Sequence, residues 1–174
     1  MRWHTHVLTG ITSLWLLEAV PGAVQPESVA ILAGLAAFGA LLPDLDAAES
    51  KIRSLSVAGV RPFAPFADAA NSAWGHRGVL HSPAVLLPLA VILSPLALWW
   101  GWPASAALWL GYASHLVADA ATKTGIPRWP GKGRLFLLPK DWRISTGSKA
   151  EDTLLPLLAF AVVVLLLKHM PFRV

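Results

Sequence analysis

Cysteine is absent from this sequence, and charged residues are scarce. Without cysteine the chain forms no disulfide and offers no thiolate to a metal. Only 14% of the residues are charged, against about 25% in an average soluble domain. Hydrophobic residues make up 55% of the chain, and its mean hydropathy is +0.57. This balance is typical of a membrane protein.

Five apolar segments predict the architecture, at roughly 7–24, 29–43, 83–102, 104–121 and 153–168. A spanning helix needs about 20 residues, so the short segments 29–43 and 153–168 either tilt or insert only in part. Two long polar stretches, 44–78 and 122–150, separate the segments. We therefore predict one all-α domain over 1–174, an integral membrane bundle of about five helices with two long loops.

The positively charged residues indicate how this bundle is oriented. If all five segments cross the membrane, the N-terminus and both long loops lie on one side. Of the 14 Lys and Arg residues, all but Lys168 and Arg173 then fall on that side. The positive-inside rule makes it cytoplasmic, which predicts a multi-pass protein of the inner membrane. Since this bias explains the net charge of +4, we expect contact with bilayer lipid and no direct binding of nucleic acid.

A His and an Asp lie four residues apart within the apolar segment 104–121. His115 and Asp119 therefore share one face of a helix, one turn apart. Such side chains are costly to bury in a membrane without a partner, and they commonly mark a function there. The pair is either two ligands of one metal ion or a hydrogen-bonded pair that stabilises a helix end.

Other His and acidic residues lie at the predicted cytoplasmic ends of the remaining apolar segments. Because the topology was assigned without these residues, their convergence on one end of the bundle favours a single shared site. We prefer His6 over its neighbour His4, which lies farther from the first apolar segment. The candidate metal ligands are His6, Asp44, Asp46, His76, His81, His115, Asp119 and Glu151.

Several of these candidates have a purely structural alternative. Asp44 and Asp46 follow Pro43 and could form a solvated helix end. Glu151 completes the motif "SKAE", a capping box with Ser148 as N-cap. Arg77 can grip a phosphate through two parallel hydrogen bonds, or it can anchor the chain to lipid headgroups. Each alternative stays open at this stage.

The types of donor indicate which cation such a site would bind. Imidazole and carboxylate ligands without thiolate suit zinc, manganese or iron(II). The number of candidates indicates two or more divalent ions, with zinc favoured. Paired metal ions can hold a hydroxide and clamp a phosphoryl group.

The order of these motifs also resembles a known family. "LLPDLD", "GHRGVLHS" and "GYASHLVAD", followed by a later Glu, resemble the membrane-bound metal-dependent hydrolases described as LexA-binding, inner-membrane-associated hydrolases. The resemblance covers roughly residues 5–151 and implies metal-ligand roles for the candidates above, with Glu151 the least direct. Ala47 stands where the family often has a His after its second Asp. A more distant similarity links the His-x-x-x-Asp helix to zinc-dependent phospholipase C and P1 nuclease.

The function expected from these residues is hydrolysis of an ester, foremost a phosphoester of a membrane lipid or lipid-linked substrate. Hydroxide held by the metal ions would attack, and Arg77 would stabilise the developing charge. Asp44 or Asp46 would act as general base if it is not a ligand. A metal-ion or proton transporter is an alternative, although only Glu18 and Glu27 supply acidic groups at the far side. A non-catalytic membrane anchor with a structural metal is the third.

Overall fold

The computed structural model describes residues 1–47, 50–56, 58–74, 78–129 and 132–170, and most of them are helical. Each predicted apolar segment forms helix, and the first is divided between two helices. The helices of these segments are α1 (Trp3–Thr12), α2 (Leu14–Glu18), α3 (Val29–Leu41), α6 (Leu86–Trp100), α7 (Trp102–Ala120) and α8 (Lys149–Lys168). The prediction of a mainly helical chain is therefore confirmed.

The two polar stretches fold into short elements of their own. The first contains the 3-10 helix η1 (Pro43–Asp46), α4 (Lys51–Ser54), α5 (Ala64–Trp74) and the 3-10 turns η2 (Val79–His81) and η3 (Pro83–Val85). Ser82 caps η3, because its hydroxyl accepts from the N–H of Ala84 at 3.3 Å. The second stretch contains the strands β1 (Ile126–Trp129) and β2 (Lys132–Leu135) and the 3-10 helix η4 (Lys140–Trp142).

The two strands correct the prediction of an all-α fold. They pair antiparallel, with Ile126 opposite Leu135 and Pro127 opposite Arg134. Strands of four residues are too short to show a clear alternation in sequence. Their pairing depends on tertiary contact, since the side chain of Ile126 is 2% exposed and packs near the end of α7.

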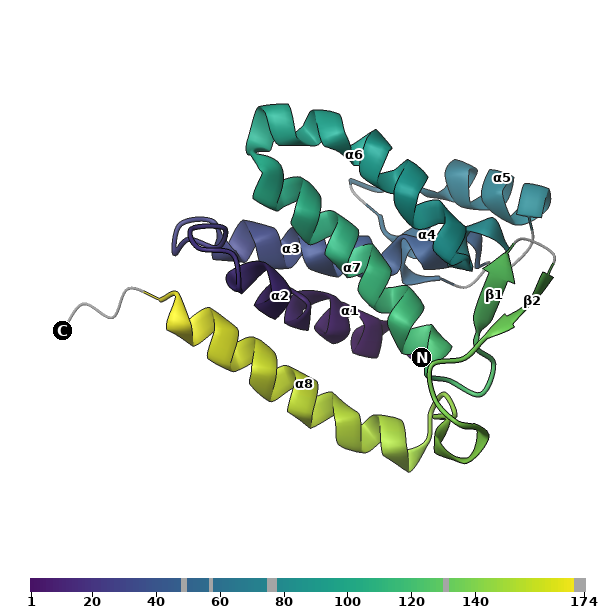
Figure 1. Cartoon of the computed structure of the whole chain (residues 1–174). Coiled ribbons are helices and arrows are strands. Elements are labelled where there is room, and N and C mark those ends of the chain that lie inside the picture. The colour runs from purple at the N-terminus through teal and green to yellow at the C-terminus, as the bar shows by residue number, and fades with distance from the viewer. Residues whose placement is uncertain (48–49, 57, 75–77, 130–131, 171–174) are drawn as a thin grey trace.

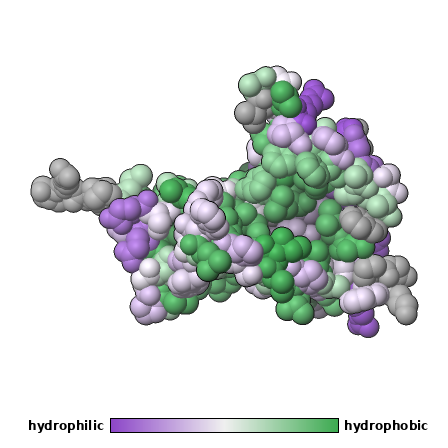
Figure 2. Space-filling view, turned by 90° about the horizontal axis from the view of Figure 1, so that it is seen from above, coloured by the Kyte–Doolittle hydropathy of each residue, from purple (hydrophilic) through white to green (hydrophobic). Residues whose placement is uncertain are grey.

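The longer helices lie roughly side by side, and the short elements gather at one end of the molecule. Figure 1 shows α4, α5 and the hairpin at the end that also holds the start of α1 and the end of α7. Figure 2 shows apolar side chains over much of the middle of one face, with hydrophilic ones toward its two ends. The polar elements and the N-terminus therefore share one end of the bundle.

Glycines allow α3 to touch α1 and α7 backbone to backbone. A Cβ added to Gly39 would lie 2.1 Å from the carbonyl oxygen of Leu108, and one on Gly111 would lie 2.0 Å from that of Ala36. A Cβ on Gly10 would lie 2.7 Å from the same Ala36 oxygen. Small residues commonly permit such close approach between membrane helices. This crossing fixes the distance between α1, α3 and α7.

Within the described residues, three helical stretches are long and apolar enough to cross a membrane. They are Val29–Asp46, Pro83–Trp100 and Lys149–Lys168. Leu87 and Leu98 on α6 are 76% and 87% exposed, as expected for side chains that contact lipid. The predicted segments 7–24 and 104–121 are not among the three. The first divides into α1 and α2, and the second carries Ser, His and Asp side chains that lower its hydropathy.

Candidate metal centre

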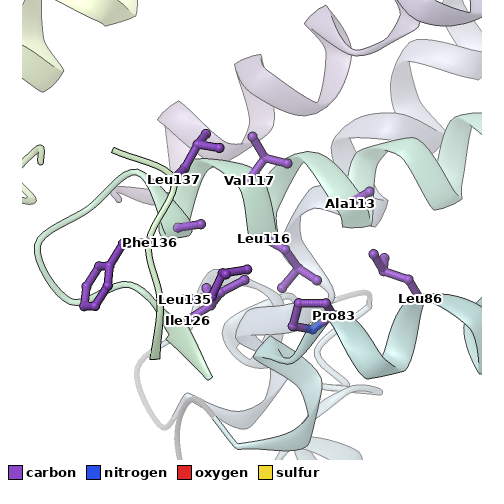
Figure 3. Close-up of a pocket in the computed structure, with 10 residues that line it drawn as sticks. Pro83, Leu86, Ala113, Leu116, Val117, Ile126, Leu135, Phe136 and Leu137 are labelled. Atoms are coloured by element: carbon purple, nitrogen blue, oxygen red, sulfur yellow. The ribbon is translucent and has the colours of Figure 1, made fainter. Parts of the chain in front are cut away.

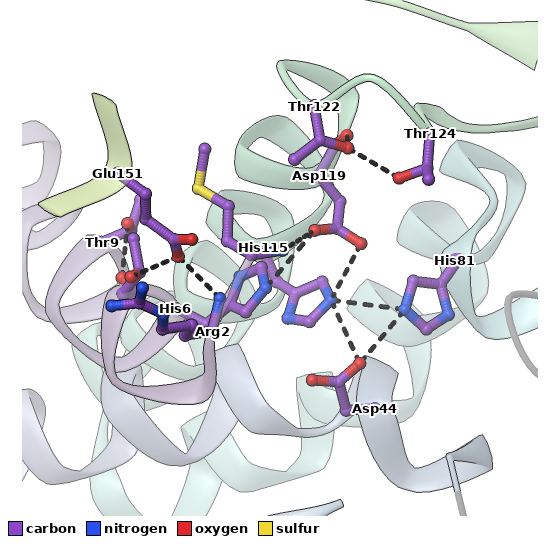
Figure 4. A network of polar contacts seen from close by, with 12 residues as sticks. Arg2, His6, Thr9, Asp44, His81, His115, Asp119, Thr122, Thr124 and Glu151 are labelled. Atoms are coloured by element: carbon purple, nitrogen blue, oxygen red, sulfur yellow. Dashed lines mark hydrogen bonds and ion pairs between the residues drawn. The ribbon is translucent and has the colours of Figure 1, made fainter. Parts of the chain in front are cut away.

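His115 occupies the centre of a buried polar cluster at this end of the bundle (Figure 4). Its Nδ1 lies 2.7 Å from the carbonyl oxygen of Ala40. That carbonyl belongs to the last turn of α3, where backbone acceptors lack a donor within the helix. Nδ1 therefore carries the proton and donates it to Ala40. The lone pair of Nε2 is left for a cation, as in histidines held by an outer hydrogen bond.

Three donor atoms surround Nε2 of His115. The Nε2 of His81 lies 3.3 Å away, Oδ1 of Asp44 3.8 Å and Oδ2 of Asp119 3.9 Å. The two carboxylate distances are too long for direct hydrogen bonds. Ligands that share a tetrahedral zinc ion at about 2.1 Å are themselves roughly 3.4 Å apart. The spacing therefore fits donors that share a cation.

The cluster contains two groups of three donors, and His115 belongs to both. One group adds His6 and Asp119, and the other adds Asp44 and His81. Within each group the donor atoms lie within 4.8 Å of one another. The side chain of Asp44 is 24% exposed, whereas the other four are at most 1% exposed. Five of the predicted ligands thus converge, and Asp44 lies on the accessible side.

His6 packs flat against His115 and faces Asp119. The two rings are stacked, with centroids 3.7 Å apart and planes at 15°. Nε2 of His6 lies 3.4 Å from Oδ1 of Asp119, and the amino group of Met1 lies 2.7 Å from that same oxygen. Nδ1 of His6 is buried and has no hydrogen-bond partner among the described residues. An unsatisfied buried nitrogen is unusual and commonly accompanies a binding or catalytic role.

Asp46 lies behind His81 and outside both donor groups. Its Oδ2 is 3.3 Å from Nδ1 of His81, an arrangement that orients the imidazole and turns Nε2 toward Asp44 and His115. Burial opposes a charge on His81, but the hydrogen bonds to Asp44 and Asp46 outweigh it and raise the pKa of His81 to about 9. Positive charge is therefore favoured at this place. The position of Asp46 suits an orienting role better than the predicted role of ligand.

Glu151 lies apart from the two donor groups and holds the N-terminal segment instead. Oε1 accepts from the N–H of Arg2 and the hydroxyl of Thr5, each at 2.7 Å, and Oε2 accepts from the N–H of Gly147 at 2.7 Å. Ser148 is the N-cap residue of α8, but its side chain makes no capping hydrogen bond. The predicted capping box is therefore wrong, because Glu151 turns to Gly147, Arg2 and Thr5.

Two predicted residues, His76 and Arg77, lie outside the described residues. One contributor that the sequence did not single out is Tyr112, the only tyrosine in the chain. Its hydroxyl donates to the carbonyl of Leu80 at 2.5 Å, which fixes the turn that carries His81. Tyr112 precedes His115 by three residues, so helical spacing was a signal that could have found it.

Comparison with known proteins places the chain in a family. The sequence matches the YdjM inner membrane protein family over residues 1–172. It belongs to the YdjM family. Over 170 residues it is 31% identical to the uncharacterized protein YvsG of Bacillus subtilis (strain 168), covering 92% of this chain and 91% of that protein.

Other members of the YdjM family are similar over a shorter stretch. The inner membrane protein YdjM of Escherichia coli (strain K12) is 38% identical over 103 residues, which cover 57% of this chain and 48% of that protein. The Shigella flexneri protein of the same name gives the same values. No solved structure matches the chain. Family membership and the apolar helices place the protein in the inner membrane, as the sequence predicted.

Proposed function

We propose that this YdjM-family protein is a membrane-bound hydrolase that depends on divalent cations. Its substrate would be a phosphoester of a membrane lipid or of a lipid-linked compound. Two or more cations would bind at the cluster, with zinc favoured and manganese or iron as alternatives. The observation that carries the proposal is the position of His115, which belongs to two adjacent groups of imidazole and carboxylate donors.

The shared histidine leaves room for a substrate or water. One imidazole nitrogen has one lone pair, so Nε2 of His115 can coordinate only one cation. A cation in the other group would then lack a third protein ligand. Catalytic sites keep such an open coordination position, whereas structural sites are closed by four protein ligands. This arrangement favours a hydrolase over an anchor with a structural metal.

Asp44 has the best access to a reacting water. It is the only partly exposed member of the two donor groups, and its Oδ1 lies 3.4 Å from Nε2 of His81. Bound cations would supply polarisation of the phosphoryl group and a more acidic water. Asp44 would position that water or accept its proton, while the buried donors keep the cations in place. Arg77 is proposed to contact the phosphate, in keeping with the sequence.

The proposed topology is a bundle of five membrane segments with this site at its cytoplasmic end. It is supported by the gathering of both polar stretches at the end that holds the cluster (Figure 1). At the opposite end Glu18 accepts from both Lys168 and His169. A transporter would require polar groups that lead from this ion-paired group toward the cluster. The buried hydrophobic cluster of Leu14, Leu17 and Leu165 instead occupies part of the region between them.

The proposal can be tested with two histidines that lie two residues apart. His6 belongs to a donor group, whereas His4 belongs to neither. Elemental analysis of the purified protein should show bound divalent metal, which His6→Gln loses and His4→Gln retains. Hydrolysis of phospholipids and lipid phosphates should follow metal content across the three proteins. Wild-type protein that binds no divalent metal would refute the proposal, and metal binding without hydrolysis would favour the transporter or the anchor.

A further inference from the structure

The chain that follows α7 folds back over the end of that helix and encloses a basic cavity. The N–H groups of Leu137 and Ile144 donate to the carbonyls of Ala120 and Ala121 at 2.8 and 3.0 Å, and that of Lys123 donates to Ile144 at 3.0 Å. A cavity of about 510 Å³ results, lined by Lys123, Lys140, Asp141 and Arg143. Its volume lies within the usual range for small-molecule sites, about 300–1,000 Å³.

The cations of this cavity are available to a ligand. Within the part of the chain that the structure describes, the side chains of Lys123, Lys140 and Asp141 make no hydrogen bond or ion pair. Two contacts hold the side chain of Arg143 in place. Its guanidinium lies 3.5 Å from the centroid of the Phe136 ring, and its Nε donates to the carbonyl of Leu138 at 3.1 Å. Three cations face one carboxylate, so the cavity favours an anion.

An apolar groove begins at the same phenylalanine. Phe136 lines a second cavity of about 270 Å³ between the N-terminal part of α6, α7 and the hairpin. Figure 3 shows Ile126 and Leu135 of the hairpin next to Leu116 of α7, with Leu86 of α6 on the other side of Leu116. Phe136 therefore lines the groove and also stacks against Arg143 of the basic cavity. The stacked pair therefore links the lining of the groove to that of the basic cavity.

Exposed tryptophans near these cavities favour a position at the depth of the lipid headgroups. Trp129 at the end of β1 is 58% exposed, and Trp142 beside Arg143 is 76% exposed. Tryptophan favours the boundary between bilayer and water. A basic cavity at that depth, next to an apolar groove, matches an amphiphile with an anionic head.

We propose that the two cavities together bind one anionic phospholipid of the bilayer. Its phosphate would lie among Lys123, Lys140 and Arg143, and an acyl chain would lie in the groove. The groove is lined by Leu116, Val117 and Ala120 on α7, whereas His115 and Asp119 lie on another face of that helix. Lipid binding therefore does not require the metal centre, and failure of one proposal leaves the other intact.

The test is titration of the purified protein, in an uncharged detergent, with two short-chain lipids. Phosphatidylglycerol and phosphatidylcholine of the same chain length isolate the effect of head charge, and native mass spectrometry counts the lipid bound. We expect phosphatidylglycerol to bind at least about tenfold more tightly, since each nearby Lys or Arg favours an anionic lipid about fivefold. Glycerol phosphate and inorganic phosphate should bind much more weakly, because neither fills the groove.

Variants assign the binding to these residues. Lys123→Gln and Lys140→Gln change exposed side chains, and each should weaken phosphatidylglycerol binding about fivefold. Phosphatidylcholine should be affected less, because its ammonium group offsets the charge of its phosphate. Asp141→Asn should strengthen it by a similar factor. Lys149→Gln is the matched control, because this exposed lysine of the same stretch lies outside the cavity. Val117→Trp fills the groove at a position that is 55% exposed and should weaken both lipids.

Three results would overturn the proposal. Equal affinity for the two lipids would show that the charge of the headgroup does not contribute to binding. An effect of Lys149→Gln as large as that of Lys123→Gln would indicate general attraction to charge rather than a site. Inorganic phosphate binding as tight as phosphatidylglycerol would show that the cavity binds free anions and that the groove takes no part.

Discussion

His6 and His115 stack face to face with ring centroids 3.7 Å apart, although they come from the first and fourth apolar segments. Both rings also turn Nε2 toward the carboxylate of Asp119, at 3.4 Å from Oδ1 for His6 and 3.9 Å from Oδ2 for His115. The stack therefore brings two imidazoles to one carboxylate, and it makes α1 part of the site.

Asp119 provides the most direct test of a cation between α1 and α7. Asp119→Asn keeps the size of the side chain but removes an anionic oxygen on which borderline cations depend. We expect metal affinity to fall on the order of 100-fold. Chelation should lower the melting temperature of the wild type, because a ligand of the native state stabilises it. The variant should respond little to the chelator, and equal metal content in both proteins would contradict a metal site here.

Gly111 should tolerate no side chain, because α3 passes against its Cα. A Cβ there would meet the carbonyl oxygen of Ala36 at 2.0 Å. Gly111→Ala should therefore destabilise the protein by about 3 kcal/mol or more, at the upper end for overpacked cores. Gly34→Ala is the control within the same bundle, since a Cβ at Gly34 meets nothing within 4 Å. Thermal unfolding in detergent would compare the two, and equal melting temperatures would refute the close crossing.

Glu151 should matter for stability and not for metal content. Glu151→Gln replaces a carboxylate that accepts three hydrogen bonds with a neutral amide. The NH2 group of that amide would face at least one of the three donors. Hydrogen bonds to charged groups contribute about 1.5–3 kcal/mol each, so we expect a loss of roughly 2 kcal/mol. Asp152→Asn, at a side chain that is 53% exposed, should cost much less. Loss of metal from a folded Glu151→Gln protein would instead indicate that Glu151 is a metal ligand.

The orientation in the membrane can be measured directly because the chain has no cysteine. Ser56→Cys lies in the first polar stretch, and Glu27→Cys lies between α2 and α3 at the other end. A membrane-impermeant thiol reagent applied to the outside of spheroplasts should label Glu27→Cys and not Ser56→Cys. Lysis should expose both. Labelling of Ser56→Cys before lysis would place the His and Asp cluster on the outer side.

Much of the site could be predicted because membrane burial makes polar residues informative. His6, Asp44, His81, His115 and Asp119 stand at the ends of apolar segments, and a bundle of antiparallel helices brings those ends together. Their convergence therefore required only the number of segments and their direction. The helical segments could be predicted equally well, because each is an apolar run in the sequence.

The roles of other residues depend on the direction of their side chains, which the spacing of residues in the sequence does not determine. Asp44 and Asp46 are two residues apart in η1, yet one faces His115 and the other lies behind His81. Glu151 has the spacing of a capping box but bonds to Arg2 and Thr5, which are distant in sequence. The hairpin was missed because its strands gain their stability from contact with α7 rather than from their own pattern. In each case a tertiary partner decides between local alternatives of similar energy.

The carboxylate of Glu151 also has a consequence for the order in which the protein is made. It lies on the last helix, and it accepts the backbone N–H of Arg2 and the hydroxyl of Thr5 at the very start of the first. During synthesis, α1 leaves the ribosome long before α7 and α8 exist. His6 therefore gains its partners on α7 first, and the hydroxyl of Thr5 gains its acceptor only when α8 has formed. The five clustered donors lie between residues 6 and 119, so they can assemble once α7 has formed. The N-terminal segment gains its hydrogen bonds to Glu151 only after α8 follows, so the donor cluster can form before its last support is in place.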